Sequence, residues 1–268
     1  MEITYQAVLP IIKEASSLMK KRDFWIENKG NVGNDVTAMD VAVQEFLIKT
    51  LAEAFPESTF MGEEDETVWS SERVAETKWL WIIDPIDGTS NFIRDLKASA
   101  ISVGLLHYGN PYLGVVYNPY IDELYYAQKG KGAFLNDTPI HVSGRDFAHS
   151  HFCTAASLYN KSLAAPCFSI MQEVYMQCDD FRRFGTASIE MTDLAAGKVE
   201  LYFEMRLFPW DYAASAVIIE EAGGFVGTCS YLDGLCYHKP IPILAANTRE
   251  NYEKLAAIVN KHVPKALY

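Results

Sequence analysis

The sequence predicts a layered fold of mixed α and β structure. Helix-like apolar spacing and short strand-like apolar runs both recur along the 268 residues. With 49% hydrophobic residues, the chain can bury a large core. No internal repeat, low-complexity tract or linker-like stretch interrupts it. We therefore expect an α/β (α+β mixed) protein built as one large domain or as two interlocked halves.

The first clear element is an amphipathic helix that begins near Thr37. Thr37 and Asp40 have the spacing of a capping box, which satisfies free N–H groups at a helix start. An apolar stripe at helical spacing follows them: Val43, Phe46, Leu47, Leu51, Ala54 and Phe55. These two signals together predict a helix.

The middle of the chain is rich in predicted strands. Apolar runs at 79–83, 98–106, 113–117 and 124–126 are separated by turn residues at 109–111 and 118–119. Farther on, segments 186–196 and 212–222 are each followed by glycine, which is typical of a helix end. A strand at 241–246 and a helix at 249–262 complete the prediction.

Charge limits the classes of partner that we expect. The formal net charge is -12, whereas nucleic acids and anionic membranes are bound through basic patches. No apolar run is long enough to span a bilayer, and Glu2, Lys13 and Glu14 interrupt the start of the chain, so we expect no signal peptide. We expect neither a nucleic-acid partner nor a membrane partner.

The cysteines indicate a reducing environment. There are five, an odd number, and none forms a C-x-x-C pair, which disfavours a disulfide framework or a zinc site. They are Cys153, Cys167, Cys178, Cys229 and Cys236. We therefore expect a cytoplasmic protein.

The most informative motif spans residues 81–92. An apolar strand ends in two carboxylates, Asp84 and Asp87, with Pro85 stiffening the turn between them. Gly88 then lets the backbone approach a ligand closely. Carboxylate oxygens suit a hard cation, and the amides of Gly88, Thr89 and Ser90 can hold phosphate oxygens. An Asp-Gly pair alone would indicate an ordinary turn, but the whole string predicts a site for a metal and a phosphate.

This motif, D-P-I-D-G-T-S-N-F, resembles the D-P-[IL]-D-G-T-x-N-F signature of the inositol monophosphatase family. Other segments agree in the family's order: V-T-A-M-D at 36–40, G-E-E at 62–64 and W-D-Y-A-A at 210–214. The stretch 114–135 also resembles the family's G-V-x-x-N-P…E-L-Y…G-K-G-A-F-x-N pattern. The resemblance extends over nearly the whole chain.

The resemblance implies a layered αβαβα sandwich of the sugar-phosphatase type. In it, an N-terminal half of helices and antiparallel sheet, about residues 1–142, packs against a C-terminal α/β half, about residues 143–268. The site lies between the halves. A homodimer is the family's usual state and the state that we expect here.

The resemblance also implies a metal site made of oxygen ligands. One ion would be held by Glu63, Asp84 and the backbone carbonyl of Ile86, and a second by Asp84, Asp87 and Asp211. Such a set favours Mg²⁺, in two or three ions, with Mn²⁺ as an alternative. Without the resemblance, the acidic run at 63–66 would be a solvated face and Asp211 a helix N-cap.

The implied catalytic residues are Glu63, Thr89 and Asp40. Glu63 and the Thr89 hydroxyl would contact the attacking water, and Asp40 would orient or deprotonate it; otherwise Asp40 only stabilises the first turn of its helix. Lys29, with residues 30–34, resembles the family's mobile loop. The remaining residues resemble positions that line the inositol pocket: Gly185, Thr186, Ala187 and Glu204.

Glu204 has a second interpretation. It could be a surface acid that pairs with Arg206. If it instead contacts a substrate hydroxyl, inositol monophosphate becomes the favoured substrate.

The predicted activity is magnesium-dependent hydrolysis of inositol monophosphate by an activated water. Proteins with similar motifs have other activities, which remain alternatives: fructose-1,6-bisphosphatase, nucleotide 3'-phosphatase and histidinol phosphatase. A regulatory binding role on the same fold is a further alternative. An aspartyl-phosphate mechanism with a D-x-D-x-T motif does not fit, because two residues separate Asp84 from Asp87. Cys153 and His149 to His151 lie in expected strand or loop segments and are interpreted as structural.

Overall fold

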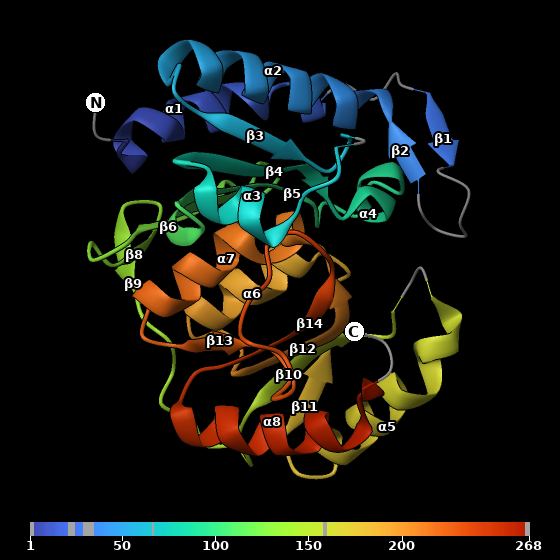
Figure 1. Cartoon of the computed structure of the whole chain (residues 1–268). Coiled ribbons are helices and arrows are strands. Elements are labelled where there is room, and N and C mark those ends of the chain that lie inside the picture. Colours follow the sequence, from blue (N-terminus) through green and yellow to red (C-terminus); the bar gives the residue numbers. More distant parts are fainter. Residues whose placement is uncertain (1–2, 21–24, 29–34, 66, 158–159, 266–268) are drawn as a thin grey trace.

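The computed structural model describes residues 3–20, 25–28, 35–65, 67–157 and 160–265. Two large β-sheets, of seven and five strands, alternate with layers of helices in the order αβαβα, which confirms the predicted sandwich (Figure 1). The helices form pairs: α1 (Tyr5–Ala15) with α2 (Ala38–Ala54), α6 (Ala187–Ala195) with α7 (Pro209–Glu221), and α5 (Ala164–Tyr175) with α8 (Arg249–His262). The middle pair, α6 and α7, lies between the two sheets (Figure 1).

The larger sheet has seven strands in chain order, and every neighbouring pair is antiparallel except β3 with β4. Its strands are β3 (Thr59–Gly62), β4 (Trp79–Asp87), β5 (Ala100–His107), β6 (Asn110–Asn118), β7 (Glu123–Gln128), β8 (Ala133–Leu135) and β9 (Thr138–Ile140). The predicted strands are confirmed. The predicted turn at 109–111 is wrong in part, because Tyr108 and Gly109 take positive φ and form the tight turn, so that β6 starts at Asn110.

The smaller sheet has five strands in the order β11-β10-β12-β14-β13. Its strands are β10 (His151–Ala155), β11 (Asp180–Arg182), β12 (Leu201–Leu207), β13 (Phe225–Gly227) and β14 (Ile241–Ala246). The bounds of β14 and α8 match the predicted ranges 241–246 and 249–262. The register of β12 against β14 shifts between Glu204 and Leu207, so this strand bends near its end.

Helix α2 begins as the capping box predicts. The Thr37 hydroxyl accepts hydrogen bonds from the Met39 and Asp40 amides, and the Asp40 carboxylate accepts from the Thr37 amide at 2.8 Å. The short hairpin of β1 (Ile26–Asn28) and β2 (Asp35–Thr37) leads into this cap. The remaining short elements are α3 (Ser71–Glu76), α4 (Thr89–Ile93) and the 3₁₀ turns Leu18–Lys20 and Lys161–Leu163.

Two glycines bring α7 unusually close to the larger sheet. Gly104 and Gly114 are paired across β5 and β6, and both face α7. A Cβ atom on Gly114 would lie 2.1 Å from the backbone oxygen of Ala214. Because only glycine leaves this space, the helix backbone can rest on the sheet. The N-terminal turn of α7 carries Asp211.

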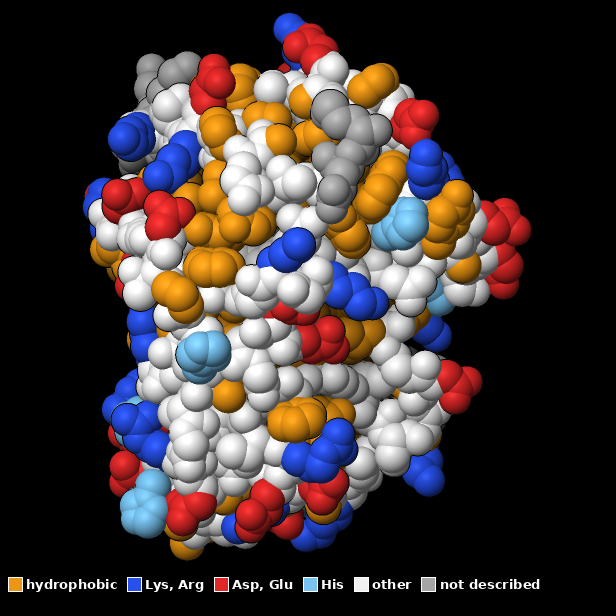
Figure 2. All heavy atoms as spheres, turned by 90° about the vertical axis from the view of Figure 1, so that its left-hand side faces the viewer, with side chains coloured by type: hydrophobic (Ala, Val, Ile, Leu, Met, Phe, Trp, Pro, Cys, Tyr) orange, Lys and Arg blue, Asp and Glu red, His pale blue; other side chains and the backbone are white. Residues whose placement is uncertain are grey.

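All five cysteines are free, and no helix among the described residues is both long and apolar enough to cross a membrane. Figure 2 shows acidic and basic side chains interspersed on one face, with hydrophobic side chains gathered over the half that contains the larger sheet. The side chains drawn in colour on that face form no continuous basic stripe.

Candidate active site

The site is built around the end of β4. Strand pairing with β5 shifts between Asp84 and Asp87, so the strand bends where its two carboxylates leave it. Both carboxylates are buried: Asp84 is 1% exposed and Asp87 is 8% exposed. The Ile86 amide donates to Asp84 at 3.0 Å, and the Ser188 amide at the start of α6 donates to Asp87 at 2.6 Å. Backbone donors from two layers therefore hold these side chains in place.

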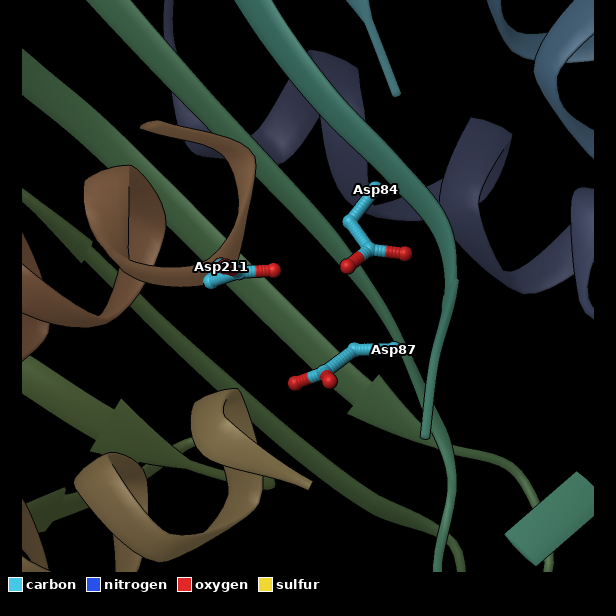
Figure 3. Close-up of side chains that lie close together, drawn as sticks. All are labelled: Asp84, Asp87 and Asp211. Carbon is cyan, nitrogen blue, oxygen red and sulfur yellow. The ribbon is translucent and has the colours of Figure 1, made fainter. Parts of the chain in front are cut away.

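Asp211 joins them from the first turn of α7. Pro209 occupies the start of this helix, where its missing N–H costs nothing, and Asp211 accepts a hydrogen bond from the Phe208 amide at 2.7 Å. One oxygen from each of Asp84, Asp87 and Asp211 lies within 4.8 Å of the others. Figure 3 shows these carboxylates turning toward a shared space between β4 and α7. Asp211 therefore caps its helix and also faces the cluster.

This cluster has the electrostatics of a cation site. Burial raises the pKa of Asp84 well above its usual range, and the nearby Glu63, Asp87 and Asp211 raise it further. Burial and the neighbouring Asp87 and Glu63 likewise raise the pKa of Asp211. Ionised carboxylates that are buried close together repel each other, and a bound divalent cation would offset this repulsion. The donor set is all oxygen, which fits a hard metal ion.

Glu63 reaches the same pocket from the end of β3. Its amide donates to the Ile83 carbonyl at 3.0 Å, which continues the β3–β4 pairing by one residue. The next acid, Asp65, is exposed but accepts from the Gly62 amide and the Gln44 side chain. Asp65 is therefore solvent-exposed and also stabilises the turn that follows β3.

Thr89 and Asp40 lie together beside the cluster. The Thr89 hydroxyl is 3.3 Å from an Asp40 carboxylate oxygen and 3.1 Å from the Ile86 carbonyl oxygen. Asp40 is fully buried, and burial raises its pKa to about 6. Asp40 thus takes both predicted positions, at the cap of α2 and beside Thr89. It does not line the pocket itself, so it would act through Thr89.

A single pocket contains most of the predicted site. Of the predicted residues that lie within the described structure, all except Asp40 line it: Glu63, Asp84, Ile86, Asp87, Gly88, Thr89, Ser90, Gly185, Thr186, Ala187, Glu204 and Asp211. Lys29 and residues 30–34 lie outside the described residues. The structure thus brings together residues from β3, β4, α4, α6, β12 and α7.

Asn91 supports the site from outside the pocket, a role that sequence reasoning missed. Its side-chain amide donates to the backbone oxygens of Ala98 and Phe184 at 2.9 and 2.8 Å and contacts the Thr186 hydroxyl at 3.1 Å. Asn91 therefore ties the turn after β4 to the turn before α6. Asn91 belongs to the 81–92 motif, so its role could have been predicted from that motif.

Glu204 is held within the protein. Its carboxylate accepts from the Tyr202 hydroxyl at 3.1 Å, and burial raises its pKa to about 7. Arg206 instead lies over the Phe208 ring, 5.1 Å from its centroid. The alternative in which Glu204 is a surface acid paired with Arg206 is therefore wrong. Sequence reasoning also missed five residues that line the pocket: Ala155, Arg183, Glu190, Arg206 and Leu207.

Comparison with known proteins agrees with this arrangement. The sequence profile of the inositol monophosphatase family matches residues 1–264. The chain belongs to the inositol monophosphatase family. This family comprises metal-dependent phosphatases, and the acidic cluster of this member is a candidate metal site.

Proteins similar to this chain include some named SuhB and some named inositol monophosphatase. This family member is 34% identical over 226 residues to the Nus factor SuhB of Escherichia coli K12, covering 84% of this chain and 82% of that protein. It is also 34% identical over 201 residues to the inositol-1-monophosphatase of Bacillus subtilis, covering 74% of each. The crystal structure of the extragenic suppressor protein SuhB from Bartonella henselae superposes with a TM-score of 0.86 at 27% identity, covering 96% of this chain and 98% of that one.

Proposed function

We propose that this protein is a magnesium-dependent phosphomonoesterase that hydrolyses phosphate esters of small polyhydroxylated compounds, inositol monophosphate among them. The observation that carries the proposal is the buried cluster of Asp84, Asp87 and Asp211 with the Thr89–Asp40 pair beside it. Such a cluster attracts metal ions, and the Thr89–Asp40 pair can accept a proton from the attacking water. The inositol-1-monophosphatase name of the Bacillus subtilis relative supports the choice of substrate.

The proposed ligands are oxygens that the structure brings to one pocket. Glu63, Asp84 and the Ile86 carbonyl would hold one ion, and Asp84, Asp87 and Asp211 a second. When bound, such ions lower the pKa of water and neutralise charge on the phosphate and on the departing alcohol. The same all-oxygen set would accept manganese.

The side chains around the cluster orient the reactants. Thr89 donates its hydrogen toward Asp40 or Ile86, so its oxygen is left to accept a hydrogen bond from the attacking water. The Asp40 carboxylate holds that hydroxyl in place through this hydrogen bond and can accept a proton relayed through it. Residues 88–90 line the pocket beside the carboxylates, where backbone N–H groups can meet phosphate oxygens. Glu204 lines the same pocket and would accept a hydrogen bond from a substrate hydroxyl.

A panel of phosphate esters tests the proposal. Phosphate release from inositol 1-phosphate, fructose 1,6-bisphosphate, a nucleoside 3'-phosphate and histidinol phosphate would be ranked by kcat/KM, with magnesium and with a chelator. We expect release that depends on magnesium and is abolished by the chelator. Full activity in the chelator would contradict the metal role, and no release from any ester would contradict the enzyme proposal.

A binding role is the second candidate, because the Escherichia coli relative is named as a Nus factor. The metal cluster and Thr89–Asp40 pair favour catalysis, but they do not exclude a second role. A pull-down with the purified protein, run beside the phosphate-release assay and repeated with an inactive Asp87→Asn variant, separates the two. The cytoplasmic location, the homodimer and the absence of nucleic-acid and membrane partners stay predictions.

A further inference from the structure

A second pocket lies apart from the active-site pocket. It is lined by residues of α3, of the turn between β5 and β6, and of the segment 232–239, and it shares no lining residue with the pocket that contains the acidic cluster. Its volume of about 430 Å³ is that of a small-molecule site. Two of its lining residues, Cys236 and His238, carry reactive groups that the mechanism proposed above does not use.

Cys236 and His238 form a pair in the wall of this pocket. The Cys236 Sγ atom lies 3.2 Å from Nδ1 and 3.8 Å from Nε2 of the His238 ring. Both side chains are partly exposed, so a ligand in the pocket can reach them. The Tyr212 hydroxyl donates to the Cys236 carbonyl and thereby holds the backbone that carries the thiol. An imidazole in this position can take up the thiol proton and leave a nucleophilic thiolate.

The charges around His238 suit the role of a base. Burial and the neighbouring Lys239 lower the pKa of His238, so the ring is neutral near pH 7 and free to accept a proton. Glu72, in the first turn of α3, attracts the ring once it is protonated. The proton that leaves the thiol therefore has a defined acceptor.

Cys236 differs in this respect from the other cysteines. Cys178 is also partly exposed, but its thiol contacts the Tyr175 and Asp180 carbonyls, and burial raises its pKa. The other cysteines are buried. Because the thiolate and not the thiol attacks an electrophile, Cys236 is the thiol that the structure prepares for reaction.

Tyr237 supplies the pocket with an unused hydrogen-bond donor. It lines the pocket, is 6% exposed, and its hydroxyl has no hydrogen-bond partner within the described part of the chain. Burial raises the pKa of Tyr237, so the hydroxyl keeps its proton. A buried polar group without a partner costs free energy, which favours a ligand that brings acceptor oxygens. Lys239, exposed in the same lining, adds a positive charge for a carboxylate.

We propose that Cys236 is a modification site that exchanges with a low-molecular-weight peptide disulfide of the glutathione type, with His238 as the base. The amide and carboxylate oxygens of such a peptide would accept hydrogen bonds from Tyr237 and Lys239. The proposal does not depend on the proposed function, because it concerns a separate pocket.

The exchange is balanced in atoms and electrons. The Cys236 thiol gives its proton to His238, and the thiolate sulfur attacks one sulfur of the disulfide. A new S–S bond joins Cys236 to one half of the disulfide while the old S–S bond breaks. The other half leaves as a thiolate and takes the proton from His238. Cys236 is thereby oxidised and the departing half is reduced, so the step needs no other oxidant.

Site-resolved kinetics test the proposal. The reduced, full-length protein is incubated with glutathione disulfide, and mass spectrometry of its peptides follows the added glutathione at each cysteine. We expect Cys236 to react about 10-fold or more faster than Cys178, because its thiolate has a base beside it. His238→Gln should bring the rate at Cys236 down toward that of Cys178 and leave Cys178 unchanged.

Two further variants separate the pair from general effects. His149→Gln changes an exposed histidine that is bonded to Asp146 and should alter neither rate. Tyr237→Phe removes the donor and should slow exchange at Cys236 by about 2- to 10-fold, the scale of one hydrogen bond. Equal rates at Cys236 and Cys178 in the wild type would overturn the proposal, as would an undiminished rate at Cys236 in His238→Gln. An unchanged rate in Tyr237→Phe would overturn the assignment of Tyr237 to the ligand.

Discussion

The Thr89 hydroxyl lies 3.3 Å from the Asp40 carboxylate, although the two residues are 49 positions apart in the chain. The contact connects the first turn of α2 to the turn that follows β4. Asp40 reaches it with one oxygen while its other oxygen caps the helix through Thr37. A capping interaction thus also fixes the position of the hydroxyl beside the acidic cluster of Asp84, Asp87 and Asp211.

Replacing Thr89 should slow the reaction without preventing substrate binding. Thr89→Ala removes the hydroxyl that would contact water, so kcat should fall by roughly 10²- to 10⁴-fold, the scale of general acid–base assistance. Thr89→Ser keeps the hydroxyl and should retain most of the activity. Thr77→Ala, which removes an exposed hydroxyl bonded only to the Arg73 carbonyl, is the off-site control. A Thr89→Ala variant with near wild-type kcat would refute the role.

Asp87 should be essential for metal-dependent activity. Asp87→Asn keeps the shape and the oxygen that accepts from the Ser188 amide, but it offers a weaker ligand to a hard cation. Outer groups of a metal site already cost about 10- to 100-fold when changed, so the loss here should exceed that range. Magnesium titrations of phosphate release should show a raised half-saturating concentration. Asp179→Asn changes an exposed aspartate for comparison, and an unaltered magnesium curve in Asp87→Asn would remove Asp87 from the site.

Glu204 should affect polyol esters selectively. If it accepts a hydrogen bond from a substrate hydroxyl, Glu204→Ala should weaken kcat/KM for inositol 1-phosphate by about 1.5 to 3 kcal/mol. An aryl phosphate has no such hydroxyl and should react almost as before. Glu253→Ala on the exposed face of α8 controls for loss of an acidic side chain. Similar losses on both esters would instead mean that Glu204 supports the fold or the metal site.

Glu190 should make stability depend on pH. Burial raises its pKa from 4.5 to about 8, so the folded state favours the protonated acid. The stability that this group contributes is fully present below pH 4.5 and is lost as pH rises to 8, at up to about 1.4 kcal/mol per pH unit. Glu190→Gln keeps an acceptor for the Phe184 and Gly185 amides without the charge.

Urea unfolding at several pH values, with magnesium held constant, measures this effect. The free energy of unfolding of wild type should decline relative to Glu190→Gln between pH 4.5 and 8. A difference between the two proteins that stays constant over this range would show that Glu190 does not change protonation there.

Gly114 should be required for the packing of α7. In Gly114→Ala the new Cβ atom would meet the backbone oxygen of Ala214 at 2.1 Å, and a backbone atom cannot move aside cheaply. Overpacking of this kind costs about 1 to 3 kcal/mol of stability, to be measured by urea unfolding. Gly144→Ala is the matched control, since its Cβ would have no neighbour within 4 Å. Equal stability of the two variants would contradict the close approach of α7 to the sheet.

Local patterns in the sequence determined many of the elements. The capping box of Thr37 and Asp40, strand β14 and helix α8 follow from turn chemistry and apolar spacing, which report the conformation of neighbouring residues. The 81–92 motif also placed Asp84 and Asp87 correctly at a strand end. The strand continues farther than its apolar run, because pairing with β5 persists through the bend.

Tertiary structure decided which distant residues meet. Asp211 reaches Asp84 and Asp87 only because Gly104 and Gly114 let α7 rest on the larger sheet. No local pattern reports that approach, and the sequence indicated it only through the family resemblance. No pattern in the sequence predicted that Arg183 and Arg206 line the pocket, because a single charged residue beside a strand belongs to no periodic pattern that would indicate its surroundings. Both lie at the pocket because β11 and β12 pair in parallel with β10, so the ends of these two strands lie at the same edge of the smaller sheet.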